Sequence, residues 1–151
     1  MKFGLRNTSF VYPDGTGNIW EDVKTHIQRA EQDGFDSSWV MDHFYQLPVH
    51  GSVEEPFLDA WTVLPALAAV TNRIRLGAMV SPVGYRNPAL LARMAASLDH
   101  ISNGRMNFGF GAGGFKPEYQ SYGFDFSARP SIRLEQMKEA LRVILGLWTD
   151  P

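Results

Sequence analysis

The sequence contains no cysteine, which excludes disulfide bonds, thiolate metal ligands and a cysteine nucleophile. It also lacks any run of about 18 apolar residues, the length that a membrane-spanning helix needs. There is no basic excess, because 14 Lys and Arg residues stand against 16 Asp and Glu residues, so nucleic acid is not an expected partner. Met1 is followed directly by structured-looking sequence instead of an apolar signal segment, and we therefore expect a cytoplasmic protein with no membrane contact.

The composition is that of an ordinary globular domain. The chain has 151 residues, of which 44% are hydrophobic and 20% are charged, with a formal net charge of -2. Domains of roughly 100 to 200 residues bury most of their chain, and disordered segments have fewer apolar residues. These values predict one domain over residues 1–151.

Apolar runs and helical patterns alternate along the chain. Short apolar runs predict strands near residues 3–7, 37–41, 74–80 and 106–110, and the first is expected to be buried. Helical patterns with capping residues predict helices near 18–33, 61–70, 87–101 and 131–148. Four βα units with a period of about 35 residues indicate an α/β fold with a parallel sheet. Such a sheet is either open and doubly wound or part of a (β/α)8 barrel.

A glycine-rich segment follows the fourth predicted strand. Gly109, Gly111 and Gly114 have the spacing of a dinucleotide-binding fingerprint, but Pro117 and Pro130 delay any long helix after them. We favour a glycine-lined strand end where backbone approaches a flat ligand. A loop that needs positive φ angles is the next interpretation, and a dinucleotide site is the least favoured.

Asp42 and His43 stand directly after the second predicted strand. Ligands of βα folds bind at the carboxyl ends of the strands, so a carboxylate and an imidazole are well placed there. Histidine can donate or accept a proton near neutral pH, and a neighbouring carboxylate can orient it. From the residues alone, a turn-capping Asp42 beside a solvated His43 is an equally good interpretation.

Other chemistries have little support. The remaining histidines, His26, His50 and His100, do not form a metal-ligand pattern, and we expect His26 and His100 to face outward. There is no nucleophile-elbow or phosphate-loop motif. The aromatic residues in and after the fourth strand favour core packing over stacking on a planar ligand.

Several ordered motifs together resemble the luciferase-like monooxygenase superfamily. They span nearly the whole chain: Val40–Pro48, Arg75–Gly77, Tyr85–Ala89, Leu98–Arg105, Gly111–Gly113 and Leu147–Trp148. The Asp42-His43-Phe44 run is most similar to the branch that uses the deazaflavin coenzyme F420. The resemblance implies a (β/α)8 barrel with the cofactor ring at the carboxyl ends of the strands.

The resemblance also assigns roles to particular residues. It implies that Asp42 contacts the ring and that His43 is the catalytic acid or base. A cis peptide between Met79 and Val80 is expected to back the ring. The ring would further be bordered by Ala112, Gly113 and Gly114, and some family members carry a carboxylate acid where Gly114 stands, so their sugar-phosphate chemistry is not expected here.

Four βα units make half of a (β/α)8 barrel, which usually needs about 250 residues. The outer strands of such a half would be unpaired edges, and the inward face, including Leu5, Val40, Leu76 and Phe108, would be open to water. The chain is then a truncation or fragment, a short or split protein that pairs, or a non-catalytic relic. We favour a fragment or half-barrel that associates, either as a homodimer or with a complementing C-terminal half.

The resemblance implies an oxidoreductase that transfers a hydride between coenzyme F420 and a small organic substrate, because deazaflavin has carbon in place of the central flavin nitrogen. An FMN-dependent luciferase-like monooxygenase is the alternative enzyme. A non-catalytic half-barrel scaffold is the alternative outside catalysis. No metal is expected.

Overall fold

The computed structural model describes residues 1–149 of the chain. Its elements follow in the order β1 (Gly4–Asn7), α1 (Ile19–Gln32), β2 (Ser37–Val40), α2 (Ala60–Val70), β3 (Arg75–Ala78), β4 (Ser81–Pro82), α3 (Pro88–Ser102), β5 (Met106–Asn107), β6 (Phe110–Gly111), α4 (Lys116–Tyr122) and α5 (Pro130–Thr149). The predicted single domain also includes Asp150 and Pro151, which lie outside the described residues.

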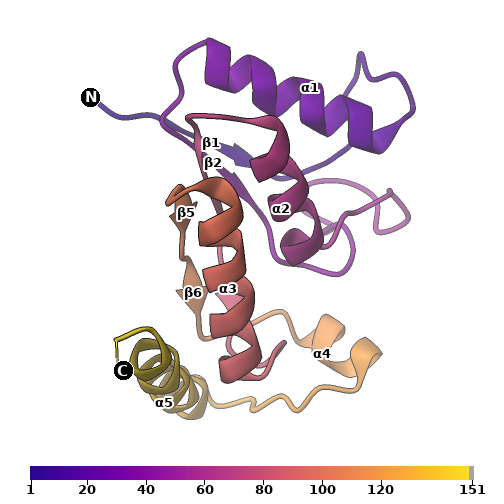
Figure 1. Ribbon diagram of the computed structural model, residues 1–151. Helices are drawn as coiled ribbons and strands as arrows, with labels where there is room; N and C mark the ends of the chain where they lie inside the picture. The colour runs from indigo at the N-terminus through magenta and orange to yellow at the C-terminus, as the bar shows by residue number, and fades with distance from the viewer. Residues whose placement is uncertain (150–151) are drawn as a thin grey trace.

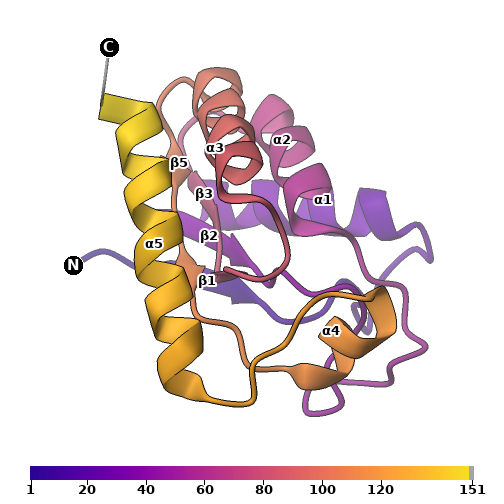
Figure 2. The same cartoon turned by 90° about the horizontal axis from the view of Figure 1, so that it is seen from below.

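The strands form a parallel sheet in the order β1-β2-β3-β5, and β4 pairs in parallel with β6 beside it. Helices α1, α2 and α3 lie along one side of this sheet, and α5 packs beside α3 (Figure 1). This arrangement confirms the predicted α/β fold with parallel strands. Figure 2 shows α4 beyond the ends of the strands toward which the arrows point.

Local sequence signals set the helix boundaries. The Asn18 side chain caps α1 by accepting from the Glu21 amide at 3.3 Å, and Val23, Ile27 and Ala30 bury one face of that helix. Helix α3 begins in the same way, because Asn87 accepts from the Ala89 amide at 2.9 Å. These are the caps that the sequence predicts.

The strands differ from the prediction in three ways. The third predicted strand, 74–80, ends at Ala78 and is followed by the separate β4. The fourth, 106–110, is divided into β5 and β6, which belong to different sheets. The first strand is an edge strand that is largely exposed instead of buried, because within residues 1–149 β2 is its single strand neighbour.

The prediction that Leu5, Val40, Leu76 and Phe108 line an open inward face is wrong. Val40 and Leu76 are fully buried, and Leu5 and Phe108 pack against the same core. The strand register explains the error, since Ser38 pairs with Leu76 and Val40 with Ala78, which places the apolar side chains on the helix side.

The opposite face of the sheet is polar and uncovered by any described helix. The register places Trp39 beside Gly77 and Gly77 beside Asn107, and Arg75 lies two residues before Gly77 on the same face. Arg75 is exposed, whereas Trp39 and Asn107 are half-buried. The fold therefore has one covered and one uncovered side, as expected of half a barrel.

Candidate functional site

The predicted site residues gather at the carboxyl ends of neighbouring strands. Asp42 and His43 closely follow β2, and Met79 and Val80 directly follow β3. The Met79 amide donates to the Val40 carbonyl at 2.8 Å, which joins the two strand ends. The peptide bond between Met79 and Val80 is cis, as the family resemblance implies.

Glycines allow β6 and the residue before it to lie against the segment Ala78–Val80. A Cβ added at Gly109 would lie 2.1 Å from the Ala78 carbonyl oxygen, and one at Gly111 would lie 2.7 Å from Val80 Cγ2. Gly113 has a φ angle of 70°. Close approach of two backbone segments and a positive φ angle thus account for these glycines.

The end of the glycine-rich segment is more open. Ala112 and Gly113 are half-buried, whereas Gly114 is exposed. A Cβ at Gly114 would have no neighbour within 4 Å in the described residues apart from those adjacent in the chain. Beside this segment, the Met79 and Val80 side chains are 39% and 43% exposed although they are apolar. The strand ends therefore carry an accessible apolar surface.

Asp42 is fully buried and joins a network of polar side chains. Its Oδ2 accepts hydrogen bonds from Arg86 Nη1 at 2.7 Å and from Trp61 Nε1 at 3.2 Å. The Trp61 indole also donates to Ser81 Oγ at 2.9 Å, next to the cis peptide, and Arg86 continues to Asp59 Oδ2 at 2.8 Å. This network connects the segment after β2, the start of α2 and the segment after β3.

The Asp42 carboxyl group is only partly satisfied. Its Oδ1 is buried and has no hydrogen-bond partner among the described residues. Burial raises the pKa of Asp42, and the Arg86 guanidinium opposes this shift without cancelling it. A buried acceptor without a donor is costly, so this oxygen suits a ligand that brings an N–H or O–H group.

His43 is held by a carboxylate that the sequence analysis did not identify. Its Nδ1 lies 2.7 Å from Oε2 of Glu118, and the same carboxylate accepts from the Phe44 amide at 2.7 Å through Oε1. The Glu118 side chain is fully buried, whereas 21% of the His43 side chain is exposed. The interpretation of a freely solvated His43 is therefore wrong.

Tyr85 completes this cluster, because its hydroxyl also hydrogen-bonds Glu118 Oε2. Its ring packs against Phe44 at 4.6 Å between ring centroids and against Tyr119 at 4.9 Å. Phe44 in turn packs against Tyr122 at 4.2 Å. The aromatic residues therefore pack on one another, as the favoured interpretation predicts.

Glu118 lies in α4, a short helix that is not among the four helices predicted from the sequence. A signal was present, since Pro117 and Glu118 in the first turn after Lys116 are typical of a helix start. Tyr85 and Arg86 belong to one of the motifs that carry the family resemblance, but the sequence predicts no role for either. Their hydrogen bonds reach residues 33 and 44 positions away, which no local pattern reveals.

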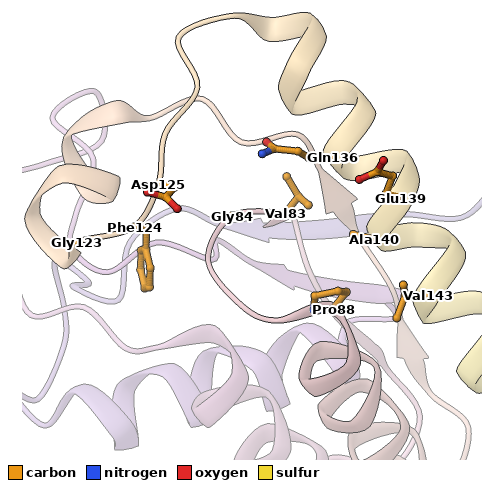
Figure 3. Close-up of a pocket in the computed structure, with 10 residues that line it drawn as sticks. All are labelled: Val83, Gly84, Pro88, Gly123, Phe124, Asp125, Gln136, Glu139, Ala140 and Val143. Atoms are coloured by element: carbon orange, nitrogen blue, oxygen red, sulfur yellow. The ribbon is translucent and has the colours of Figure 1, made fainter.

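A cavity of about 570 Å³ lies between α5 and the loop after α4, beside the aromatic cluster, because Phe124 lines it and packs against Tyr85 at 5.9 Å between ring centroids. Figure 3 shows Glu139, Ala140 and Val143 of α5 on one side and Phe124 and Asp125 on the other. None of the predicted site residues lines it. Its lining residues include no hydrogen-bonded pair of titratable groups, unlike the cluster around Glu118.

Within residues 1–149, no three His, Asp or Glu side chains are grouped closely enough to hold a metal ion. None of the described helices combines the length and the hydropathy required to cross a bilayer. His100 is exposed as expected, but His26 is half-buried and packs on Tyr12 at 4.7 Å between ring centroids.

Comparison with known proteins gives a family match over the whole chain. The family model described as "Luciferase-like monooxygenase" matches residues 1–151. Among curated proteins, the chain is 35% identical over 131 residues to the F420-dependent glucose-6-phosphate dehydrogenase of Amycolatopsis mediterranei. It is also 35% identical over 129 residues to the pyrimidine monooxygenase RutA of Pantoea ananatis.

These alignments cover most of this chain but a smaller part of each relative. They include 85% and 83% of this chain, and 38% and 34% of the two relatives, respectively. A solved structure of an F420-dependent secondary alcohol dehydrogenase in complex with an F420-acetone adduct is similar with a TM-score of 0.79 and 27% identity. That similarity covers 99% of this chain and 42% of the solved one, so the fold corresponds to part of a luciferase-like barrel.

Proposed function

The chain belongs to the luciferase-like monooxygenase family, and we propose that its complete form transfers a hydride between coenzyme F420 and a small organic substrate. Two relatives named above support the cofactor, since their names state dependence on F420. The relatives named above are oxidoreductases and monooxygenases, and the proposed hydride transfer starts from that general class.

One observation carries the proposal: the His43 imidazole is partly exposed at the carboxyl end of β2 and anchored through Nδ1 to a buried carboxylate. A histidine in this position can exchange a proton with a ligand at the strand ends. The accessible apolar side chains of Met79 and Val80 flank the same edge of the sheet. Together they offer an acid–base group beside an apolar surface.

The residues present fit a flat, hydrogen-bonding cofactor. The buried Oδ1 of Asp42 lacks a donor, and a cofactor ring that carries N–H groups would supply one. We propose that Met79, Val80, Ala112, Gly113 and Gly114 border the ring. Gly114 leaves open space where a side chain would stand, which permits close approach of a ligand.

Coenzyme F420, when bound, supplies a carbon centre that accepts or returns the hydride. The protein residues handle the proton. For a substrate with a hydroxyl group, oxidation removes a hydride from carbon and a proton from oxygen. We propose that His43 takes this proton as the general base and returns it in the reverse reaction.

The chain spans between a third and two fifths of these curated relatives, so we propose that the second half of the barrel completes the site. In (β/α)8 barrels, the loops after strands seven and eight frequently bind phosphate groups. The four βα units described here then supply the ring surface and the acid–base group. Either a complementing C-terminal half or a second copy of the chain would supply the rest.

Cofactor titration tests the proposal directly. We expect the complete protein to bind F420 and to reduce it anaerobically with an alcohol, measured by loss of deazaflavin absorbance. His43→Gln should retain F420 binding and lower the turnover number by about 10²-fold or more, because general acid–base catalysis contributes about 10² to 10⁴-fold. Retained turnover in His43→Gln would contradict the role of His43.

The FMN-dependent monooxygenase is the second candidate, favoured by the 35% identity to a pyrimidine monooxygenase. Parallel titrations with FMN and F420 separate the two. If neither cofactor binds at high micromolar concentration, while Asp42→Ala and His43→Ala still fold, the non-catalytic scaffold is the better description.

A further inference from the structure

The Glu118 carboxylate is the centre of a buried hydrogen-bond cluster at the edge of the proposed site. Its Oε1 accepts a hydrogen bond from the Phe44 amide. Its Oε2 accepts one from the Tyr85 hydroxyl and lies within hydrogen-bond distance of His43 Nδ1. The partners come from the segment after β2 and the segment before α3, and Glu118 itself comes from α4. Three separate parts of the chain thus meet at one carboxyl group.

Two of these partners are donors whatever the state of His43. A backbone N–H can only donate, so Oε1 of Glu118 must accept from Phe44. Burial, reinforced by Glu118, raises the pKa of Tyr85, so its hydroxyl keeps its proton and donates. Burial opposes ionisation of Glu118, but hydrogen bonds from His43, Tyr85 and the Phe44 amide outweigh it and lower the pKa of Glu118.

An ionised carboxylate only accepts hydrogen bonds, which decides the role of the histidine nitrogen that it contacts. The His43 Nδ1 must carry a proton in order to bond Glu118 at 2.7 Å. In neutral imidazole the other nitrogen, Nε2, is then unprotonated. Within residues 1–149, Nδ1 is the His43 ring nitrogen that has a hydrogen-bond partner, so Nε2 is left available to a ligand.

We propose that Glu118 is a positioning residue that fixes neutral His43 as the Nδ1–H tautomer, with Nε2 as the proton-accepting atom. The inference rests on the proposed function for its catalytic meaning, but the tautomer itself is a property of the chain without cofactor. Histidine bases in hydrolytic triads are oriented by a carboxylate according to the same logic. Here the carboxylate lies 75 residues away from the histidine in the sequence.

The other charged and titratable groups near His43 do not compete for its ring. Asp42, the preceding residue, is engaged by Arg86 and Trp61. The Phe115 ring lies edge-on to the imidazole at 6.1 Å between centroids and brings no charge. Within residues 1–149, Tyr85 donates its hydrogen bond to Glu118 and makes none to His43. Glu118 is therefore the group that determines the tautomer.

Nitrogen NMR of the ¹⁵N-labelled chain without cofactor tests the inference. Long-range ¹H–¹⁵N correlations at about pH 9, where ordinary histidines are neutral, distinguish the two tautomers. The His43 signals are assigned by their loss in His43→Gln. We expect a protonated Nδ1 and an unprotonated Nε2 in the natural sequence, and an Nε2–H tautomer there would overturn the inference without need of any Glu118 variant.

Glu118→Gln supplies the decisive comparison. The Phe44 amide holds the glutamine carbonyl oxygen, so the glutamine NH₂ faces His43 and donates to Nδ1, which shifts the histidine to Nε2–H. Tyr85→Phe is the matched control, since it removes one hydrogen bond from Glu118 but leaves the carboxylate, and we expect it to retain Nδ1–H. An unchanged tautomer in folded Glu118→Gln would overturn the inference.

The catalytic consequence is measured separately in the complete protein. Glu118→Gln should lower the turnover number by about 10²-fold with little change in F420 affinity, and Glu118→Asp should restore part of it. If the tautomer shifts in Glu118→Gln but F420 does not bind even to the natural sequence, the proposed function fails and the tautomer assignment stands. If F420 binds and His43 is required, but the tautomer is unaffected by Glu118, the positioning role fails alone.

Discussion

At Asp42, burial and charge pairing act on the same carboxyl group in opposite directions. Burial raises its pKa, and the contact with Arg86 at 2.7 Å favours the ionised form. The Asp42 side chain is fully buried and the Arg86 side chain is 11% exposed, so neither charge is well solvated. Removing one member of such a pair leaves the other charge buried without a partner.

Arg86→Met should therefore lower the free energy of unfolding by about 3 kcal/mol at pH 7, as measured by urea denaturation. Asp42 with a raised pKa binds its proton more tightly in the folded state, so its unfavourable effect disappears at pH values below its unfolded-state pKa. The deficit of Arg86→Met should accordingly shrink as the pH falls toward about 4. Adding Asp42→Asn to Arg86→Met should recover part of the lost stability. If the stability losses of the two single variants simply add in the double variant, Asp42 and Arg86 are not coupled and the explanation is contradicted.

The glycines after β5 give a second prediction at the scale of single residues. Gly109→Ala places a Cβ against the Ala78 carbonyl oxygen, a backbone atom that cannot move aside easily. We expect a loss of stability of about 1 to 3 kcal/mol in thermal or urea denaturation. Gly114→Ala is the control, because it meets open space, and it should stay within about 0.5 kcal/mol. Equal losses in both variants would contradict the packing explanation.

Between elements, the side chain of Glu31 connects α1 with the turn before β3. Its Oε1 accepts from the amides of Arg73 at 2.6 Å and Ile74 at 2.8 Å, and from that of Asn72 at 3.0 Å. Burial opposes ionisation, but these amide hydrogen bonds outweigh it and lower the pKa of Glu31. The helix and the incoming strand are thus joined by one ionised carboxylate.

Glu31→Gln should reduce the free energy of unfolding by about 1 kcal/mol at pH 7. Because the pKa of Glu31 is lowered in the folded state, its contribution is present above the unfolded-state pKa of about 4.3 and is lost as the pH falls below it. Urea denaturation at several pH values between 7 and 3 measures the difference in the free energy of unfolding between the variant and the natural sequence. We expect this difference to shrink as the pH falls. Exposed Glu139→Gln is the control, and a difference that grows in acid would refute the assignment.

At the scale of the whole molecule, the four-stranded sheet has two outer strands with an edge that is unpaired within residues 1–149, and α5 has exposed apolar side chains. Strands β1 and β5 are its edges, and five large apolar side chains of α5 are exposed. They are Ile132, Leu134, Val143, Leu145 and Leu147. If β5 of one copy pairs with β1 of another, α5 comes to lie near α1 of the second copy, because each helix covers its own strand.

We propose that the 151-residue chain forms a homodimer when no C-terminal half is present. Sedimentation velocity at micromolar concentration should give twice the mass of 16.9 kDa. Leu145→Asp should shift the chain toward the monomer, whereas Arg142→Asp, also exposed on α5, should have a much smaller effect. A well-folded monomer at this concentration would count against the dimer.

The sequence by itself determined the features that depend on neighbouring residues. Caps such as Asn18 and Asn87 act within three residues, so the helix starts were predictable. The motif around Asp42 and His43 placed them correctly after a strand, and the resemblance to a family placed the cis peptide at Met79 and Val80. In these cases the physical cause is local or the whole motif is present in the chain.

The tertiary structure alone decided which face of the sheet is covered and what holds His43. Val40 and Leu76 could lie on either side, because alternation defines two faces but only the packing of helices selects one. Glu118 meets His43 across 75 residues, and Arg86 meets Asp42 across 44, so only the folded chain brings these charges together. Burial then changes their pKa values, and no pattern of neighbouring residues carries that information.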